Sequence, residues 1–216
     1  MVEYQLTHQD ALAMFFNSIF LGEKLGYKSD VINRMIKEVY LDVGDVKEQL
    51  KETRPEIAVP GYVSPDGKVI VLDERYVGQQ LGKYDLSRFR EYLQNYEFQE
   101  VGVNEEYLLH LLYDVIQQSA MDHEALGHSY PIFSGEINKL RKKIRKELSL
   151  KKVSPSDYEK EGVRMLKKRT ELLASEAQIK CAEYRMRVCQ DGLTKIIWKV
   201  WTKILKEEYN KTGVVS

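Results

Sequence analysis

Hydrophobic and polar positions along the chain are spaced mainly as in helices. The apolar segment 11–21 (ALAMFFNSIFL) is too short to cross a bilayer and follows acidic residues instead of a basic leader, so it predicts a buried helix. A second helix is expected to begin at Ser29 and to end before Pro55. Its apolar side chains recur at near-helical spacing, at Val31, Met35, Val39 and then Val43 or Val46.

The segment from Pro60 to Val77 has a different character and predicts a β-hairpin. The Pro-Asp-Gly sequence at 65–67 is a turn sequence, because Pro fixes one backbone angle and Gly permits a positive φ. Residues 68–72 (KVIVL) then form a β-branched run that is too short for a helix. This hairpin is the only β structure that the pattern predicts.

Helical periodicity returns after the hairpin. A short helix is expected from Asp85 to Tyr96. Asn104 is a candidate N-cap for a long helix that runs towards His128 and is apolar on most sides, as a central buried helix should be. We interpret the next residues, 129–133 (SYPIF), as a loop.

Two charged helices are predicted beyond this loop. The segment from Lys139 to Lys152 carries eight basic residues and a single acid, while Leu140, Ile144 and Leu148 repeat at every fourth position. One face of this helix is therefore expected to pack while the other is solvated. Ser154 then predicts the N-cap of a long helix that reaches Gln190, with Pro155 in its first position and Asp157 in its third.

A last helix is expected after Asp191, a candidate N-cap. Its apolar positions form an amphipathic stripe of Leu193, Ile196, Ile197, Val200, Trp201, Ile204 and Leu205. The other face carries Lys195, Lys199 and Lys203 beside Trp198. Packing in the core is the favoured interpretation of the stripe, followed by a homodimer contact and then a membrane contact.

These patterns together predict a mainly α (α+β) fold with a small β-hairpin or sheet. The chain of 216 residues suits one domain, 1–216, with N-terminal helices in 1–58, the hairpin and central helices in 60–190, and the amphipathic helix in 191–210. No segment resembles a transmembrane span. Lys and Arg total 33 and balance 33 Asp and Glu, so no net charge attracts nucleic acid or membranes.

The two cysteines indicate a reducing, intracellular (cytoplasmic) setting. Cys181 and Cys189 lie eight residues apart on one predicted helix. This spacing corresponds to about 12 Å, which is too far for a disulfide bond.

The candidate chemistry lies at residues 122–128 (DHEALGH), where His123 and His128 bracket Glu124. Two neutral imidazoles can bind zinc, and a carboxylate can activate a water molecule beside the metal. Five residues on a regular helix turn the two rings about 140° apart, whereas the four of H-E-x-x-H turn them only about 40°. We therefore predict a π-bulge or an unwound turn, with Gly127 adopting the unusual backbone angles. Alternatively, the helix ends at Gly127 as a left-handed C-cap and His128 lies beyond it.

The residues HEALGH resemble the HELLGH zinc motif of the dipeptidyl peptidase III family. More broadly, the chain is similar to a minimal gluzincin, a zinc metallopeptidase in which a strand beside the zinc helix offers its edge to an extended peptide. The resemblance implies a third zinc ligand, a glutamate in an E-x-x-A sequence, and Glu171 with Ala174 fits this pattern. Glu176 and Glu183 are alternative third ligands without that sequence context. Small residues around Glu171 would let its helix approach the zinc helix closely.

The resemblance also implies the role of each residue. His123, His128 and Glu171 would hold Zn²⁺, and Glu124 would act as the general base in the hydrolysis of a peptide or protein substrate. Tyr130 or Tyr184 would stabilise the oxyanion, and the sequence does not choose between them. If the metal is absent, the imidazole nitrogens of the two histidines should lie within about 4 Å of one another and face Glu171. His110 lies 13 residues before His123, or about 20 Å along a helix, so it is expected to have a packing role.

A second function class stays open at this point. The chain could be a non-catalytic helical module, or a degenerate zincin scaffold, that binds a protein or a nucleic acid through the basic helix from Lys139 to Lys152. Metal content and the position of His128 distinguish this class from the peptidase.

Overall fold

The computed structural model describes residues 6–46, 59–83, 105–151 and 153–213. Over these residues the protein is mainly helical with one small sheet, as the sequence predicts. The expected helix from Asp85 to Tyr96 and the expected cap Asn104 lie outside the described residues. The helices are α1 (His8–Lys24), α2 (Ser29–Glu38), α4 (Tyr76–Lys83), α6 (Glu105–Asp122), the π-helix η2 (His123–Ser129), α7 (Tyr130–Phe133), α8 (Glu136–Leu150), α9 (Pro155–Val188) and α10 (Gly192–Gly213).

The predicted hairpin is confirmed and belongs to a three-stranded sheet. Strand β2 (Gly61–Val63) pairs antiparallel with β3 (Val69–Asp73). Their turn contains Gly67 at φ 79°, a left-handed conformation that favours glycine. The sheet order is β1-β3-β2, so β2 is an edge strand among the described residues.

The prediction that the second helix continues towards Pro55 is wrong. Helix α2 ends at Glu38, and the following residues form strand β1 (Tyr40–Gly44), which pairs in parallel with β3. Apolar residues at near-helical spacing also fit a short strand with one buried side chain, Leu41. The partner strand lies almost thirty residues later in the sequence, so local periodicity could not reveal the pairing.

The predicted loop at 129–133 is also wrong, because the chain continues from η2 directly into helix α7. Pro131 lies in the first turn of α7, where the missing N–H of proline has little cost. Tyr130 and Phe133 are buried, so this turn belongs to the core.

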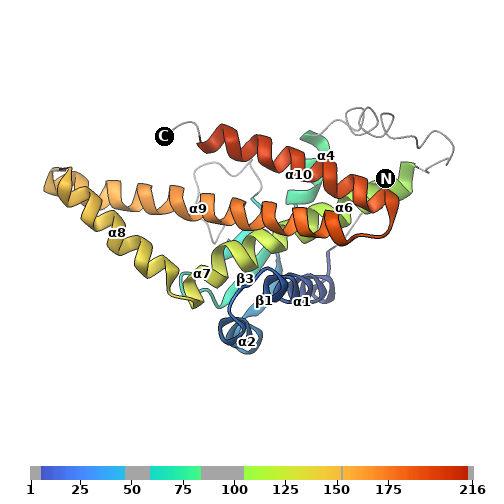
Figure 1. The fold of residues 1–216 in the computed structure, drawn as a ribbon, viewed down its shortest axis with the longest axis horizontal. Helices are drawn as coiled ribbons and strands as arrows, with labels where there is room; N and C mark the ends of the chain where they lie inside the picture. Colours follow the sequence, from blue (N-terminus) through green and yellow to red (C-terminus); the bar gives the residue numbers. More distant parts are fainter. Residues whose placement is uncertain (1–5, 47–58, 84–104, 152, 214–216) are drawn as a thin grey trace.

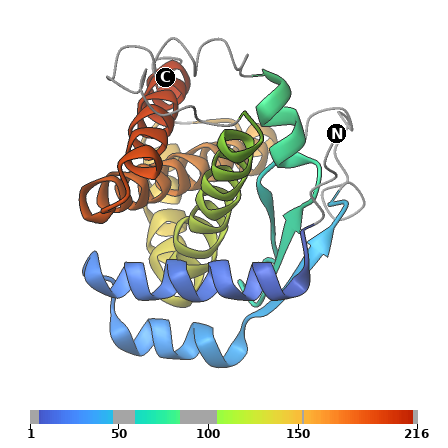
Figure 2. The ribbon, with the colours of Figure 1, turned by 90° about the vertical axis from the view of Figure 1, so that its right-hand side faces the viewer.

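The consecutive helices α6, η2 and α7 form the centre of the molecule. Figure 2 shows α6 with α1 crossing beneath it, the sheet on one side, and α9 and α10 on the other. The apolar stripe of α10 packs in this core, with Ile197 and Trp201 fully buried, as the favoured interpretation expected. Trp198, which the sequence placed beside the lysines, is buried too and lies under the Arg185 guanidinium.

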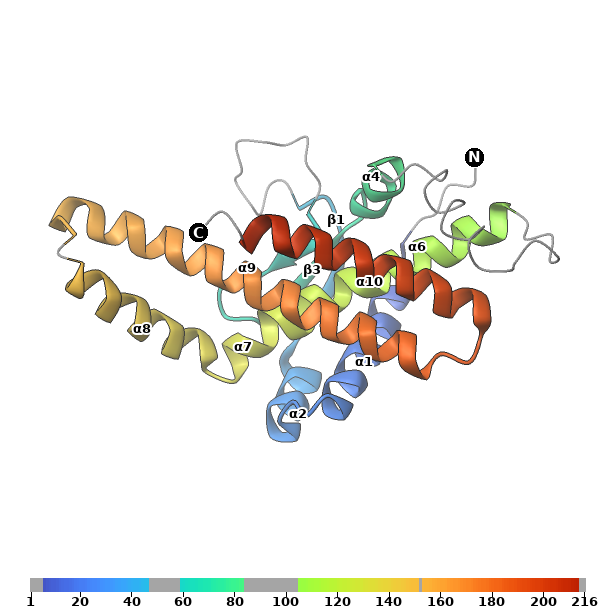
Figure 3. The ribbon, with the colours of Figure 1, turned by 45° about the horizontal axis from the view of Figure 1, so that its top comes forward.

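Helices α8 and α9 form a long hairpin that extends away from the sheet and the N-terminal helices (Figures 1 and 3). Ser154 caps α9 through its side chain, which accepts a hydrogen bond from the Asp157 amide, as predicted. Ile144 and Leu148 of α8 are buried against α9, while the basic side chains of α8 face outwards.

None of the helices in the described parts of the chain is long and apolar enough to cross a membrane.

Candidate metal centre

The two histidines of the motif meet on one face of η2. Their Nε2 atoms lie 3.2 Å apart although five residues separate them. A π-helix makes this contact because its i→i+5 hydrogen bonds align residues five apart, and the Tyr130 amide accordingly donates to the Ala125 carbonyl. The predicted π-helical distortion is therefore confirmed, and the alternative in which the helix ends at Gly127 is wrong.

Gly127 has a different role from the one expected. The described glycines with positive φ are Gly26, Gly67 and Gly135, so Gly127 does not adopt a left-handed conformation. A Cβ at Gly127 would lie 2.4 Å from the Cα of Ala174 and 2.6 Å from its Cβ. The absence of a side chain thus lets η2 and α9 touch through their backbones.

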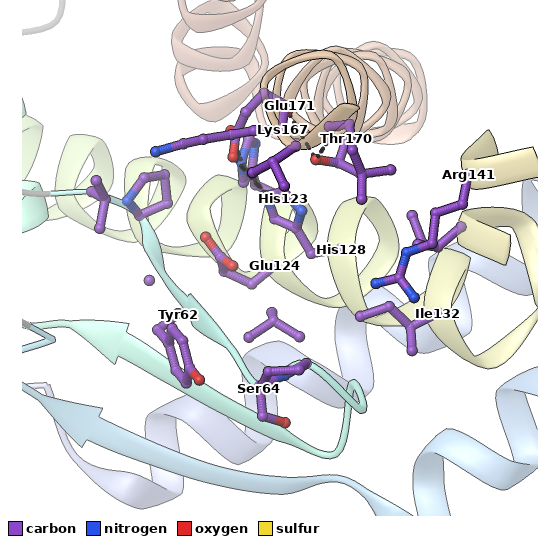
Figure 4. Close-up of a pocket in the computed structure, with 18 of the residues that line it drawn as sticks. Tyr62, Ser64, His123, Glu124, His128, Ile132, Arg141, Lys167, Thr170 and Glu171 are labelled. Atoms are coloured by element: carbon purple, nitrogen blue, oxygen red, sulfur yellow. Dashed lines mark hydrogen bonds and ion pairs between the residues drawn. The ribbon is translucent and has the colours of Figure 1, made fainter. Parts of the chain in front are cut away.

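This close approach places Glu171 of α9 opposite both histidines. Its Oε2 lies 3.7 Å from His123 Nε2, and its Oε1 lies 3.8 Å from His128 Nε2. Figure 4 shows the carboxylate above the two rings, on the side of the pocket formed by α9.

The alternative third ligands have other partners on α10. The Tyr209 hydroxyl donates to Glu176 Oε1 at 2.6 Å, and Lys206 Nζ lies 2.7 Å from Glu183 Oε1. Among the three candidate glutamates, the structure therefore brings only Glu171 to the histidine pair.

Glu124 is the second carboxylate beside the histidines. It is buried, and its carboxylate and the ring nitrogens of His123 and His128 all lie within 4.8 Å of one another. Burial, opposed by the charge of His123 and assisted by the carboxylate of Glu171, raises the pKa of Glu124 to about 7. Gly61 of β2 makes room for this side chain, because a Cβ at Gly61 would lie 3.0 Å from the Glu124 Cγ.

A chain of hydrogen bonds fixes the orientation of His123. The Gln178 amide nitrogen donates to the Ser119 carbonyl at 3.1 Å and to the Ser119 hydroxyl at 2.9 Å. Because a carbonyl only accepts, the amide oxygen of Gln178 must face His123 Nδ1, which lies 3.3 Å away. His123 Nδ1 is therefore the protonated nitrogen, and Nε2 keeps its lone pair for a ligand. Trp201 Nε1 also donates to the Ser119 hydroxyl, at 2.8 Å, and anchors the chain in the core.

Near neutral pH, at most one of the two imidazoles is positively charged. Burial lowers the pKa of His123, but Glu171, Glu124 and Gln178 together raise it above the ordinary value. Burial, and after it the charge of His123, lowers the pKa of His128 to about 4. Near neutral pH, His128 is therefore an uncharged donor suited to a metal ion.

A buried ion pair holds the end of α6 where the motif begins. The Asp122 carboxylate accepts hydrogen bonds from Arg185 Nη2 at 2.9 Å and Nε at 3.2 Å. The Ser18 hydroxyl donates to it at 2.6 Å and the Gln118 amide at 3.3 Å. Helices α1, α6 and α9 thus converge on the residue that precedes His123.

The histidines open into a pocket of about 670 Å³. Its walls are β2 with its turn, η2, α7, the first turns of α8 and the middle of α9, as the close-up in Figure 4 shows. A site with three protein donors and access to a pocket leaves room for a further ligand, which is typical of catalytic rather than structural zinc sites.

The donor set and its spacing fit zinc. Two nitrogens bound at about 2.0–2.1 Å in a tetrahedral site lie about 3.3 Å apart. The observed separation of the Nε2 atoms is 3.2 Å, and a carboxylate faces both of them. His123, His128 and Glu171 could therefore hold the ion with small adjustments of the side chains.

The expected oxyanion stabilisers, Tyr130 and Tyr184, lie away from the pocket. The Tyr130 hydroxyl accepts a hydrogen bond from the Lys28 amide in the core, and Tyr184 packs under the Arg187 guanidinium. Neither lines the pocket, whereas Tyr62 of β2 does. His110 also lies away from the histidine pair, beside a different pocket, but it is half-buried.

Comparisons with family models, with curated proteins and with solved structures gave no match.

Proposed function

We propose that the protein is a zinc-dependent metallopeptidase. The observation that carries the proposal is the convergence of His123, His128 and Glu171 at the mouth of a pocket, with the buried carboxylate of Glu124 beside them. Zinc bound there would polarise a peptide carbonyl and lower the pKa of a water molecule.

The residues around the ion would transfer the protons and orient the metal ligands. Glu124 makes no ion pair or hydrogen bond with the side chains around it in the described parts of the chain, so its carboxylate is available to accept a proton from water. A raised pKa makes this carboxylate a stronger base than an exposed one, and it would later give the proton to the leaving amine. Gln178 keeps the lone pair of His123 Nε2 directed at the ion.

The edge of β2 supports a peptide as the substrate. In an antiparallel ladder, hydrogen-bonded residue pairs alternate with pairs that are not hydrogen-bonded. The Ser64 amide donates a hydrogen bond to the Val69 carbonyl, so the pairs of Val63 and Gly61 with β3 are of the second kind. Gly61 and Val63 therefore direct their amide and carbonyl groups away from β3. The strand lines the pocket, so an extended peptide could pair with these groups and pass the metal.

The alternative is a non-catalytic helical module, either zinc-binding or a degenerate zincin scaffold, that binds a protein or a nucleic acid. A regular helix with His128 facing solvent would have favoured this alternative, whereas the His128 side chain is 18% exposed and its ring contacts His123. The basic side chains of α8 are exposed, and one of them, Arg141, lines the pocket.

The experiment is hydrolysis of a mixture of unstructured peptides by the zinc-loaded protein, read by mass spectrometry. Cleavage should occur in the wild type and fall at least about a hundredfold in Glu124→Gln, which keeps the size of the side chain and loses the base. Zinc content, measured in parallel, should stay the same in this variant. Absence of cleavage by the zinc-loaded wild type, or loss of zinc from folded Glu124→Gln, would contradict the assigned roles.

A further inference from the structure

The pocket carries an excess of positive charge beyond the metal centre. Its two acidic lining residues, Glu124 and Glu171, belong to the proposed zinc site. The other charged side chains in the described lining are Lys167 and Arg141. Lys167 lies one helical turn before Glu171 and lowers the pKa of that carboxylate, so its charge acts on the metal ligand.

Arg141 is the cation that the metal centre does not use. It lies on α8, is exposed, and forms no ion pair or hydrogen bond with the side chains that the structure describes. By contrast, Arg164 pairs with Glu161 at 2.7 Å and Arg169 pairs with Glu147 at 2.6 Å on the same helical hairpin. A guanidinium presents a planar set of donors that matches a carboxylate, and in Arg141 this set is free to bind a ligand.

The surroundings of Arg141 suit the apolar part of a bound side chain. Val163 and Leu166 of α9 line the pocket together with Arg141, and the same three residues line a neighbouring cavity of about 450 Å³ between α8 and α9. Val163 is 64% exposed, so its side chain is accessible to a bound ligand. A carboxylate bound by Arg141 would thus lie next to an apolar wall.

The position of this wall gives the distance from the reacting bond. Leu166 and Val163 precede Glu171 by five and eight residues, which corresponds to about 8–12 Å along α9. An extended peptide advances about 3.3 Å per residue, so the interval spans roughly two to four residues.

We propose that Arg141 is a specificity-determining residue that binds a carboxylate of the peptide two to four residues from the scissile bond. This inference rests on the proposed peptidase function and adds the class of substrate, a peptide with a negative charge at that distance. The carboxylate can belong to an acidic side chain or to the C-terminus of a short peptide, and the experiment separates these two sources.

The test uses the full-length zinc-loaded protein and peptides that share one cleavage site. In the first set, glutamate or the isosteric glutamine is placed at each position up to four residues on either side of the cleavage site, and the C-terminus is amidated. A second set carries glutamine throughout and ends in a free acid or an amide. At one position, kcat/KM should be about fivefold higher for the charged peptide, the upper range for an exposed ion pair.

Three variants assign this preference to Arg141. Arg141→Gln should reduce the charged-to-neutral ratio to about one, and Arg141→Glu should favour lysine at the same position. Lys143→Glu is the matched control, because it changes the net charge equally from a point about 200° round the helix and should keep the wild-type ratio. Thermal unfolding of each variant checks the fold.

The outcomes separate this inference from the function on which it rests. Cleavage of neutral peptides with no preference for a carboxylate at any position, or a preference that survives in Arg141→Glu, would overturn the role of Arg141 alone. Cleavage of none of the peptides would overturn both proposals.

Discussion

Gly127 and Ala174 touch through their backbones: a Cβ on Gly127 would lie 2.4 Å from the Ala174 Cα. This contact joins the π-helix to α9 three residues from Glu171, and it sets the distance at which the carboxylate faces the histidines. The geometry of the candidate metal centre therefore depends on a residue that contributes no side chain.

Gly127→Ala should separate η2 from α9, because neither backbone can yield to a methyl group at this distance. We expect a loss of about 3 kcal/mol in the free energy of unfolding, the upper range for overpacking, together with weaker zinc binding. Chemical denaturation and zinc titration measure the two effects. Gly78→Ala is the control: its Cβ would meet no atom within 4 Å, and alanine should preserve or slightly increase the stability of helix α4. Equal behaviour of the two variants would contradict the packing argument.

Gln178→Leu should weaken zinc binding while the fold persists. The variant removes the acceptor of the His123 Nδ1 proton, so the ring can rotate or change tautomer. Loss of such an outer-shell partner lowers metal affinity about 10- to 100-fold. Competition with a chelator gives the dissociation constant, and the spectrum of the cobalt-substituted protein reports the altered ligand geometry. Unchanged affinity and an unchanged spectrum would refute the orienting role of Gln178.

Arg185→Met should destabilise the protein by about 3–5 kcal/mol, because it leaves the buried Asp122 carboxylate without its counter-charge. The double variant Asp122→Asn/Arg185→Met should recover part of this loss, since no buried charge remains. Urea denaturation of the two single variants and the double variant gives the coupling energy. Additive effects would contradict a direct interaction between the two side chains.

Helix periodicity predicted most of the helices, but it could not predict β1. Val39 and Val43 continue the spacing of α2, and the strand forms only because β3 offers a parallel partner far along the sequence. Residues 129–133 were likewise expected to form a loop, whereas the preceding π-helix carries the chain into α7 without a break. Both errors reflect tertiary contacts that a local pattern does not contain.

The residues of the candidate metal centre were more predictable from the sequence than the residues that orient them. The spacing of His123 and His128 required a distorted helix, and the small residue Ala174 indicated a close approach by Glu171. Gln178 lies two helical turns after Glu171 on the same face, so its position carried a signal for its role. Ser119 and Arg185, by contrast, reach the site only through contacts between helices that are distant in the sequence. Tyr130 was expected to stabilise the oxyanion, but its hydroxyl lies in the core, where it accepts a hydrogen bond from the Lys28 amide.

Zinc affinity should fall as the pH decreases. Protons compete with the metal for His123 Nε2, and the carboxylates and Gln178 raise the pKa of His123 despite its burial. A raised pKa means that the proton is held to a higher pH, so competition should begin above the ordinary histidine value of about 6.5. Chelator competition between pH 5.5 and 8.5 measures this dependence. In Glu124→Gln, which removes one of the charges, the decline should begin at a lower pH; an affinity independent of pH would contradict histidine ligation.

The most direct test of the account is the zinc content of the purified protein, measured by inductively coupled plasma mass spectrometry after exchange into chelator-free buffer with one added equivalent of zinc. The account predicts about one zinc per chain in the wild type and in the control Glu176→Gln, whose side chain faces α10. His123→Ala, His128→Ala and Glu171→Gln should each lose most of the metal, because each removes one of three ligands. A wild-type protein that binds no zinc, or histidine variants that keep it, would contradict the central claim.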